Sequence, residues 1–477
     1  AAGAAYNIIF TEDPMKLIYG IKDKPKFGQL VVFAIQQLLA IMAATLVVPV
    51  IIGNGMSTSA ALFGAGVGTL VYVLFTKGRS PVFLGSSFAF LGSMAAAFAG
   101  GVSMNLGYAG LILGAIFAGL VYVVIALVVK LVGVKWISKL MPAVVIGPTV
   151  AIIGLSLAGN AVGDLVSGGV KNAEGASLAS PLIALLCGLV TLAVTMLCST
   201  YGKKALKLIP FIIGILAGYA VASVFTVIGN ACDIDALKVI NFSVFESLLT
   251  DGKVTLSTFF SAPEFTFLTA AKGVSELNAS YVIAIAFAYV PVAFVVFAEH
   301  IADHKNISSI IEKDLLEDPG LHRTLLGDGV GSMVGAIFGG CPNTTYGESI
   351  ACVAITRNAS VATIIGAAVS AIIVSFVNPF VAFVNSIPSC VMGGVCMALY
   401  GFIAVSGLKM VQKVDLEENK NLFVVSVILI AGIGGLTVNF GAVTLTEVAT
   451  ALILGILTNL ILSGKKKNSE SVGSDKE

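Results

Sequence analysis

Long apolar runs, broken by short charged segments, fill most of this 477-residue chain. A helix needs about 20 mostly apolar residues to cross a lipid bilayer, and the pattern predicts fourteen such segments. We therefore expect an all-α, polytopic membrane protein. The predicted segments lie near residues 28–52, 59–76, 81–99, 108–131, 142–163, 181–199, 209–229, 281–299, 325–340, 343–357, 359–384, 388–407, 421–439 and 441–463.

Three of these segments are only weakly apolar. The third is interrupted by a Gly-Ser-Ser triplet, the ninth opens with Gly-Asp-Gly, and the tenth carries the polar run NTTYGE. The basic residues support keeping all three. With both ends of the chain in the cytoplasm, only four of the 27 Lys and Arg residues fall outside, as the positive-inside rule requires.

Composition agrees with a membrane protein, since 57% of the residues are hydrophobic and only 11% are charged. A soluble domain carries about 25% charged residues. The net charge of +1 gives no field that would attract nucleic acid. The seven cysteines form no CxxC pair, so we predict neither a disulfide framework nor a metal site. Residues 1–27 lack the apolar core of a cleavable signal peptide, and we place them, like the tail 464–477, in the cytoplasm.

The stretch 230–280 divides the segments seven and seven. Because seven is odd, the second half (281–463) starts from the membrane face opposite to that of the first half (28–229). Halves of the same fold would then be related by an axis in the membrane plane, as in the inverted repeats of many transporters. We expect 230–280 to be an extracellular connector, either solvated or with a small hairpin or surface helices.

The third and tenth segments occupy matching places in the two halves. Irregular backbone inside a bilayer is tolerated only where protein or a water-filled cavity covers it. We expect each segment to be a short extended piece followed by a half-helix, with the helices starting near Phe88 and near Gly347-Glu348. The two starts would present unpaired N–H groups and positive dipole ends at mid-membrane.

Glu299 ends a 19-residue apolar run. A charged group at the bilayer centre costs about 2.5–3.5 kcal/mol on insertion scales, so an intramembrane acid indicates a functional site. The alternative is a residue at the cytoplasmic end of the helix, because His300 and Asp303 follow. His304 or Asp303 could relay a proton, or both could be solvated loop residues. His322 is interpreted as structural.

Glu348 stands where the second half-helix should start, and it is interpreted as a partner of Glu299. Two carboxylates in a low-dielectric cavity repel each other, so one of them would take up a proton. Carboxylates accept hydrogen bonds from N–H groups, whereas helix N-termini donate to carbonyls, and Phe88 and Tyr346 offer flat apolar faces. The pattern favours a flat heterocycle with alternating N–H and C=O groups, such as a pyrimidinedione.

Six sequence motifs resemble the nucleobase–ascorbate transporter (nucleobase:cation symporter-2) family, and above all its bacterial uracil:proton symporters. The motifs are LGSSFAF at 84–90, AEH at 298–300, DLLEDPGLHR at 314–323, PNTTYGE at 342–348, AITR at 354–357 and VMGGV at 391–395. The resemblance implies a core domain (spans 1–4 and 8–11), a gate domain (spans 5–7 and 12–14), uracil as substrate and a homodimer in the cell membrane.

Carried over residue by residue, the resemblance assigns Glu299 and Glu348 as the two substrate-binding glutamates. Glu299 would also be the protonation site. It further implies that Phe88 and Tyr346 line the base and that Gly347 offers its backbone. Tyr400, in MALYG, matches a tyrosine near the site.

The chain departs from the family pattern at three points. The Gln-His pair of the first span reads Gln36-Gln37, and the Asn that follows the signature acid is Ser349. The family's His four residues after the first glutamate is Asp303 here, with His304 displaced by one. A histidine-assisted proton relay is therefore not supported by the pattern.

The expected function is proton-coupled symport of uracil by alternating access, without enzymatic activity and without a cofactor, the proton being the coupling ion. Three alternatives stay open. One is a xanthine or purine carrier of the same fold, against which the acid at 348 argues. The others are an anion exchanger or channel and an intramembrane hydrolase that uses Glu299 and Glu348 as paired carboxylates.

Overall fold

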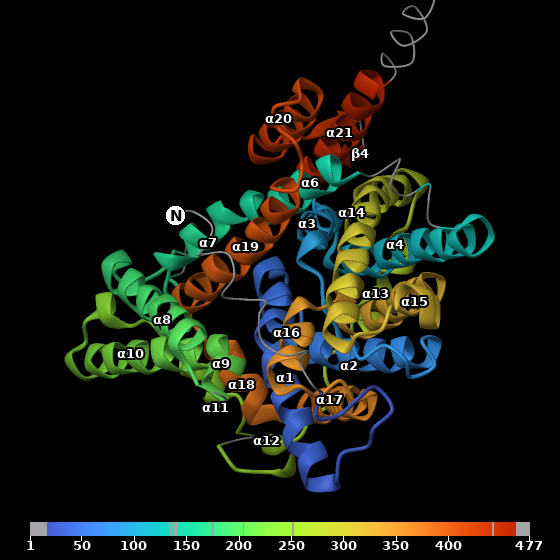
Figure 1. Cartoon of the computed structure of the whole chain (residues 1–477). Helices are drawn as coiled ribbons and strands as arrows, with labels where there is room; N and C mark the ends of the chain where they lie inside the picture. The colour runs from blue at the N-terminus through green and yellow to red at the C-terminus, as the bar shows by residue number, and fades with distance from the viewer. Residues whose placement is uncertain are drawn as a thin grey trace, which may run out of the picture.

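The computed structural model describes residues 17–133, 136, 142–172, 176–203, 205–249, 252–440 and 443–463, and it is mostly helical (Figure 1). In this described part, eight helical stretches are long and apolar enough to cross a membrane, by length and composition. They are α1 (Phe27–Ile52), α2 (Thr58–Phe75), α4 (Met104–Val132), α6 (Ala143–Ser156) with α7 (Ala158–Leu165), α8 (Pro181–Tyr201), α10 (Pro210–Cys232), α14 (Ala279–Ile311) and α19 (Ser389–Val411).

Shorter or less apolar helices occupy most of the remaining predicted segments. They are η1 (Phe88–Phe90) with α3 (Leu91–Ala97), α15 (Leu321–Gly339), α16 (Gly347–Thr356), α17 (Val361–Val374), α18 (Asn378–Ser386), α20 (Asn419–Ile433) and α21 (Glu447–Ser463). The connector 230–280 carries the surface helices η2 (Asp235–Leu237), α11 (Ser243–Glu246), α12 (Leu256–Phe259), α13 (Thr266–Gly273) and η3 (Val274–Glu276). Two further short helices, α9 (Ala205–Leu208) and η4 (Leu316–Gly320), lie between spans.

Helix α14 is much longer than the predicted segment 281–299, because it continues to Ile311. Its added turns bury His300, His304, Ile307 and Ile311, a spacing that places them on one helix face. The interpretation of Glu299 as a helix-end residue is therefore wrong, and so is the placement of His300, Asp303 and His304 beyond the span. An average of hydropathy over a window misses such a one-sided continuation.

Two predicted segments at the end of the chain also have wrong boundaries. The segment 359–384 breaks into α17 and α18, where Pro379 stands in the first turn of α18 and fits only a helix start. Helix α20 ends at Ile433, and a hairpin of β3 (Val438–Phe440) and β4 (Val443–Leu445) precedes α21. Gly435, at φ 67°, provides the left-handed turn after α20.

The third and tenth segments do contain extended pieces. Strand β1 (Leu84–Ser86) pairs with strand β2 (Asn343–Thr345) in antiparallel register, with Gly85 opposite Thr344. The amide of Ser87 donates to the Pro342 carbonyl (2.9 Å) and extends the ladder by one bond. The strand pair thus joins the two halves of the chain in the interior.

The helices pack as two groups. The first helix group consists of α1, α2, α3, α4, α14, α15, α16 and α17, and the second of α6, α7, α8, α10, α19, α20 and α21 (Figure 1). Packing pairs recur between the halves of the chain: α4 packs on α15 as α17 packs on α2, and α1 packs on α17 as α14 packs on α4. In the second group, α8 packs on α19 as α20 packs on α6.

Helices α2 and α15 form the closest pairing of the first group, and glycines make it possible. A Cβ on Gly68 would lie 2.7 Å from the Gly331 carbonyl oxygen, and one on Gly331 would meet the Gly68 carbonyl oxygen at the same distance. Gly64 and Gly335 face each other one turn further along. Small residues let membrane helices approach closely enough for extensive van der Waals contact.

Candidate functional site

A cavity of about 390 Å³ lies between the two helix groups. The first group contributes α1, α14 and α16, and the second contributes α6, α8, α10 and α19 together with α9. The residues with polar or charged side chains that line it are Ser199, Lys207, Glu299, Asp303, Glu348 and Ser406. Pockets of this size are typical of small-molecule sites.

The strand pair sets the position of the two half-helices. Helix η1 begins at Phe88, directly after β1, and α16 begins at Gly347, directly after β2. Neither Ser87 nor Tyr346, the residues that precede these helices, caps its helix with a side chain. The predicted half-helix starts are therefore present. A Cβ on Gly347 would meet no atom within 4 Å, so the start of α16 is open to the cavity.

Three carboxylates face this cavity. Glu299 and Asp303 lie one turn apart on α14, and Glu348 lies in the first turn of α16. Asp303 accepts a hydrogen bond from the hydroxyl of Thr345 (2.7 Å), the last residue of β2. No ion pair to Glu299 or Glu348 occurs among the described residues. A ligand therefore does not have to displace a cation from either glutamate.

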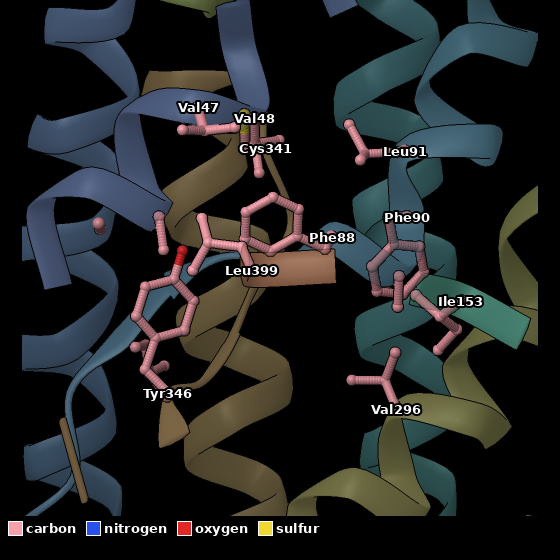
Figure 2. Close-up of a cluster of buried hydrophobic side chains, with 14 of the residues drawn as sticks. Val47, Val48, Phe88, Phe90, Leu91, Ile153, Val296, Cys341, Tyr346 and Leu399 are labelled. Carbon is pink, nitrogen blue, oxygen red and sulfur yellow. The ribbon is translucent and has the colours of Figure 1, made fainter. Parts of the chain in front are cut away.

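The predicted aromatic residues Phe88, Tyr346 and Tyr400 are buried and do not line this cavity, and Figure 2 shows Phe88 and Tyr346 in a cluster of buried side chains. Tyr346 is buried and donates its hydroxyl to the Ser86 carbonyl (2.7 Å), and its ring occupies the space that a side chain on Gly85 would need. Phe88 meets Tyr400 edge to face, with ring centroids 5.8 Å apart. The structure therefore brings Glu299, Glu348, Asp303 and Gly347 together in one cavity, and it places the aromatic residues in a layer beside that cavity.

Gln37 is a site residue that the sequence did not single out beyond its departure from the family pattern. Its side-chain amide is buried and donates to the hydroxyl and, at 3.3 Å, to the carbonyl of Ser349. The same hydroxyl accepts a hydrogen bond from the Phe83 amide (3.0 Å). Gln37 and Ser349 therefore fix the first turn of α16 against α1 and the start of β1.

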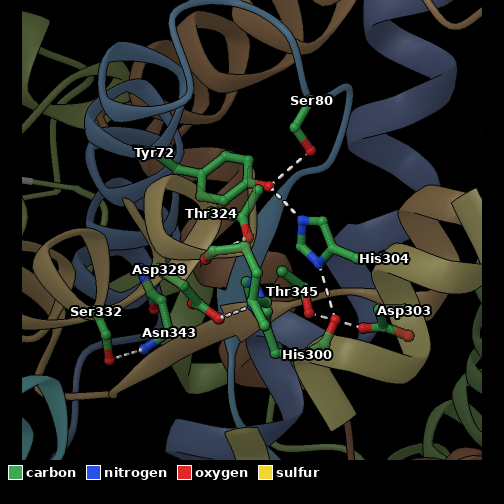
Figure 3. Close-up of polar contacts among 11 residues, drawn as sticks. Tyr72, Ser80, His300, Asp303, His304, Thr324, Asp328, Ser332, Asn343 and Thr345 are labelled. Atoms are coloured by element: carbon green, nitrogen blue, oxygen red, sulfur yellow. Dashed lines mark hydrogen bonds and ion pairs between the residues drawn. The ribbon is translucent and has the colours of Figure 1, made fainter. Parts of the chain in front are cut away.

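A second buried polar network lies on the side of α14 that faces α2 and α15 (Figure 3). His300 contacts the carboxylate of Asp328 through Nδ1 (2.7 Å) and the Thr324 hydroxyl through Nε2 (3.0 Å). His304 hydrogen-bonds with the Tyr72 hydroxyl (2.7 Å), which donates to Ser80. His304 is therefore a partner in this network and not a residue of the cavity wall.

Solved structures of low sequence identity share this fold. The transmembrane domain of a cyanobacterial bicarbonate transporter, BicA, matches with a TM-score of 0.60 at 15% identity, covering 93% of this chain and 100% of that chain. The murine anion transporter Slc26a9, solved in the inward-facing state, matches with a TM-score of 0.62 at 11% identity, covering 93% and 69%. At such identities the likeness shows the fold alone.

Sequence relatives are much nearer. A uracil permease of Bacillus caldolyticus is 38% identical over 460 residues, 96% of this chain and 97% of the relative. A uracil permease of Escherichia coli K12 is 36% identical over 444 residues, 93% of each. The profile of the "Permease family" (Xan_ur_permease) matches residues 28–441. The protein is thus a multi-pass membrane permease and not an enzyme, and the chain belongs to the xanthine/uracil permease family, the nucleobase:cation symporter-2 family that its motifs indicate.

Proposed function

We propose that this chain carries uracil into the cell together with protons, by alternating access. The observation that carries the proposal is the convergence of Glu299 of α14 and Glu348 of α16 on one cavity between the two helix groups. The names of the relatives, uracil permeases at 36–38% identity over nearly the whole length, support the substrate.

In the proposed complex, the carboxylates of Glu299 and Glu348 accept the two N–H groups of uracil. The N–H groups at the start of α16 donate to a ring carbonyl, and Gly347 leaves room for the ring. Phe88, Tyr346 and Tyr400 bound the site from behind. The contact of Tyr346 with Ser86 supports a role in holding the strand pair in place.

Proton coupling is assigned to Glu299, with Asp303 one turn away as a second carboxylate for the relay. Asp303 suits the role of second proton acceptor better than His304 does, because Asp303 lines the cavity and His304 is hydrogen-bonded to Tyr72. Proton and uracil must favour each other's binding, and that coupling is reciprocal. One proton crossing a potential of 100 mV contributes about 2.3 kcal/mol to accumulation. No other cofactor is invoked.

We further propose that the fourteen spans form two inverted seven-span repeats. The recurring packing pairs of the two halves support this arrangement. The first helix group would be the core domain and the second the gate domain. Both termini are assigned to the cytoplasm by the positive-inside rule, and a homodimer follows from the family resemblance alone.

The rival functions differ in how well they suit the cavity. Three carboxylates would repel an anion, which argues against an anion exchanger or channel even though the fold neighbours are a bicarbonate and an anion transporter. The acid at 348 argues against a purine or xanthine carrier, and competition of uptake by unlabelled uracil and by xanthine tests this distinction.

The decisive experiment measures labelled uracil uptake into proteoliposomes with an imposed inward proton gradient. Wild-type protein should accumulate uracil, lose it with an uncoupler, and be competed by unlabelled uracil but not by xanthine. Glu299→Gln should abolish gradient-driven uptake. Folded protein that takes up no uracil above empty liposomes would refute the proposal.

A further inference from the structure

The open cavity has a closed counterpart in the other half of the chain. In chain order, α3, α6 and α21 correspond to α16, α19 and α10, which all line the open cavity. Residues of α3, α6 and α21, with η1, also meet around one space, but that space measures only about 10 Å³. The same three kinds of element thus enclose a large cavity on one side and almost none on the other.

The closed contact joins the two helix groups directly. Phe88 and Gly92 come from the first group, whereas Ile153 of α6 and Thr446 and Glu447 at the start of α21 come from the second. A Cβ on Gly92 would lie 3.6 Å from Thr446 Cγ2 and 3.9 Å from Glu447 Oε1. Figure 2 shows Ile153 beside Phe90, next to this contact.

Only a thin apolar layer separates this contact from the open cavity. Leu399 lines the open cavity, its neighbour Tyr400 packs against Phe88, and Phe88 lines the closed space. Separation of α3 from α6 and α21 would therefore bring Phe88 into contact with the opposite side of the membrane, next to the site that the carboxylates form.

We propose that the contact of α3 with α6 and α21 is the closed extracellular gate, and that Glu447 stands at the entrance through which the solute arrives. This inference rests on the inverted repeat and the membrane orientation of the proposed function. Glu447 is partly buried, and no ion pair to it occurs among the described residues. Its carboxylate would accept an N–H group of a neutral heterocycle, as the two glutamates of the cavity do.

The gate can be locked by a disulfide. The Cβ of a residue at 92 would lie 3.8 Å from the Cβ of Thr446, which is close to the mean Cβ separation of about 3.8 Å in disulfides. The double variant Gly92→Cys/Thr446→Cys would carry Cys232→Ser as well, because Cys232 is the one exposed cysteine in the described part of the chain. Oxidation should abolish uptake into proteoliposomes, and a reductant should restore it.

Controls separate a locked gate from a damaged protein. Each single cysteine variant should keep its uptake under oxidation. So should Ala34→Cys/Gly366→Cys, a pair within the first helix group whose Cβ atoms would lie 3.0 Å apart and need to separate by a few tenths of an ångström. Uptake by protein shown to be crosslinked between 92 and 446 would overturn the proposal.

A second readout does not depend on the solute. In the Cys232→Ser background, a maleimide that cannot cross membranes should label Glu447→Cys from the outside in the uncrosslinked protein and not after the 92–446 crosslink has formed. Peptide mass spectrometry distinguishes the label on residue 447 from label on the cysteines at 92 and 446. Labelling that is unaffected by the crosslink would remove Glu447 from the gate. Because this readout involves no uracil, a failure of uracil transport and a failure of the gate assignment give different results.

Discussion

Asp303 and His304 are neighbours in the chain, but their side chains have different surroundings. Asp303 lines the cavity, whereas His304 is fully buried and bonded to Tyr72. We expect Asp303→Asn to fold normally and to flatten the dependence of uptake on external pH, because one proton acceptor of the cavity is lost. The measurement is the rate of uracil uptake at external pH values between 5 and 8, for wild type and for Asp303→Asn.

His304→Ala should act on stability instead. It leaves the Tyr72 hydroxyl without its imidazole partner and opens a void, so the melting temperature in detergent should fall while the pH profile of the residual uptake keeps its shape. A flattened profile for His304→Ala, with Asp303→Asn unchanged, would contradict the assignment of the relay to Asp303.

Substitution of Ser349 tests the hydrogen bonds that hold the first turn of α16 in place. Its hydroxyl accepts from Gln37 and from the Phe83 amide, so Ser349→Ala leaves two buried donors without that acceptor. An unsatisfied buried donor costs about 1–3 kcal/mol. We expect reduced thermal stability and weaker uracil binding, measured by a thermal-shift titration. Ser406→Ala, at a hydroxyl that lines the cavity, is the matched control and should leave stability unchanged.

At the residue scale, the sequence predicts the charged members of the site better than their supports. Glu299 and Glu348 stand out because a carboxylate inside an apolar segment needs a functional reason. Gln37, Ser349 and Asp328 do not stand out, since their partners are hundreds of residues away or on another helix. No local pattern shows that a glutamine in one span meets a serine in another.

At the element scale, Gly85 within β1 and Gly347 just after β2 should respond differently to the same substitution. Gly85→Ala would drive a methyl group into the Tyr346 ring and disturb β1 and β2, whereas Gly347→Ala meets no atom within 4 Å and fills part of the cavity. We expect Gly85→Ala to lower the yield and melting temperature of the protein. Gly347→Ala should melt like wild type and bind uracil more weakly in a titration. Equal melting temperatures for both would contradict the role of Gly85.

The sequence predicts the existence of the elements better than their ends. The extended pieces of the third and tenth segments follow from their Gly, Ser, Asn and Thr content. The extension of α14 to Ile311 does not, because the added turns are apolar on one face only. The hairpin before α21 lies where the predicted segments 421–439 and 441–463 meet, and its short apolar runs do not distinguish a strand from a helix.

At the scale of the whole molecule, the orientation in the membrane can be tested with native chemistry. Cys232 is exposed at the end of α10 and lies, by the positive-inside assignment, outside the cell. An impermeant maleimide should label it on intact cells, and Cys232→Ser should abolish that signal. Labelling that requires permeabilised cells would reverse the orientation and move the proposed gate to the cytoplasmic side.

The turn before α15 illustrates a surface arrangement that spacing alone does not predict. Asp318 forms ion pairs with Arg79 and, at 2.8 Å, with Lys313. These two cations hold the pKa of the Asp318 carboxyl below its ordinary value. The three residues come from the loop after α2 and from the turn between α14 and α15. They belong to one helix group, which supports movement of that group as a unit.

The strand pair also bears on how the protein is made. Leu84 of β1 pairs with Thr345 of β2, so the partner strand leaves the ribosome long after the first strand has entered the membrane. Until then, the backbone of β1 lacks its hydrogen bonds, each of which costs several kcal/mol when unsatisfied in lipid. The first half of the chain therefore cannot complete its fold before β2 has been synthesised. Until then, we expect water or protein of the insertion machinery to cover the backbone of β1.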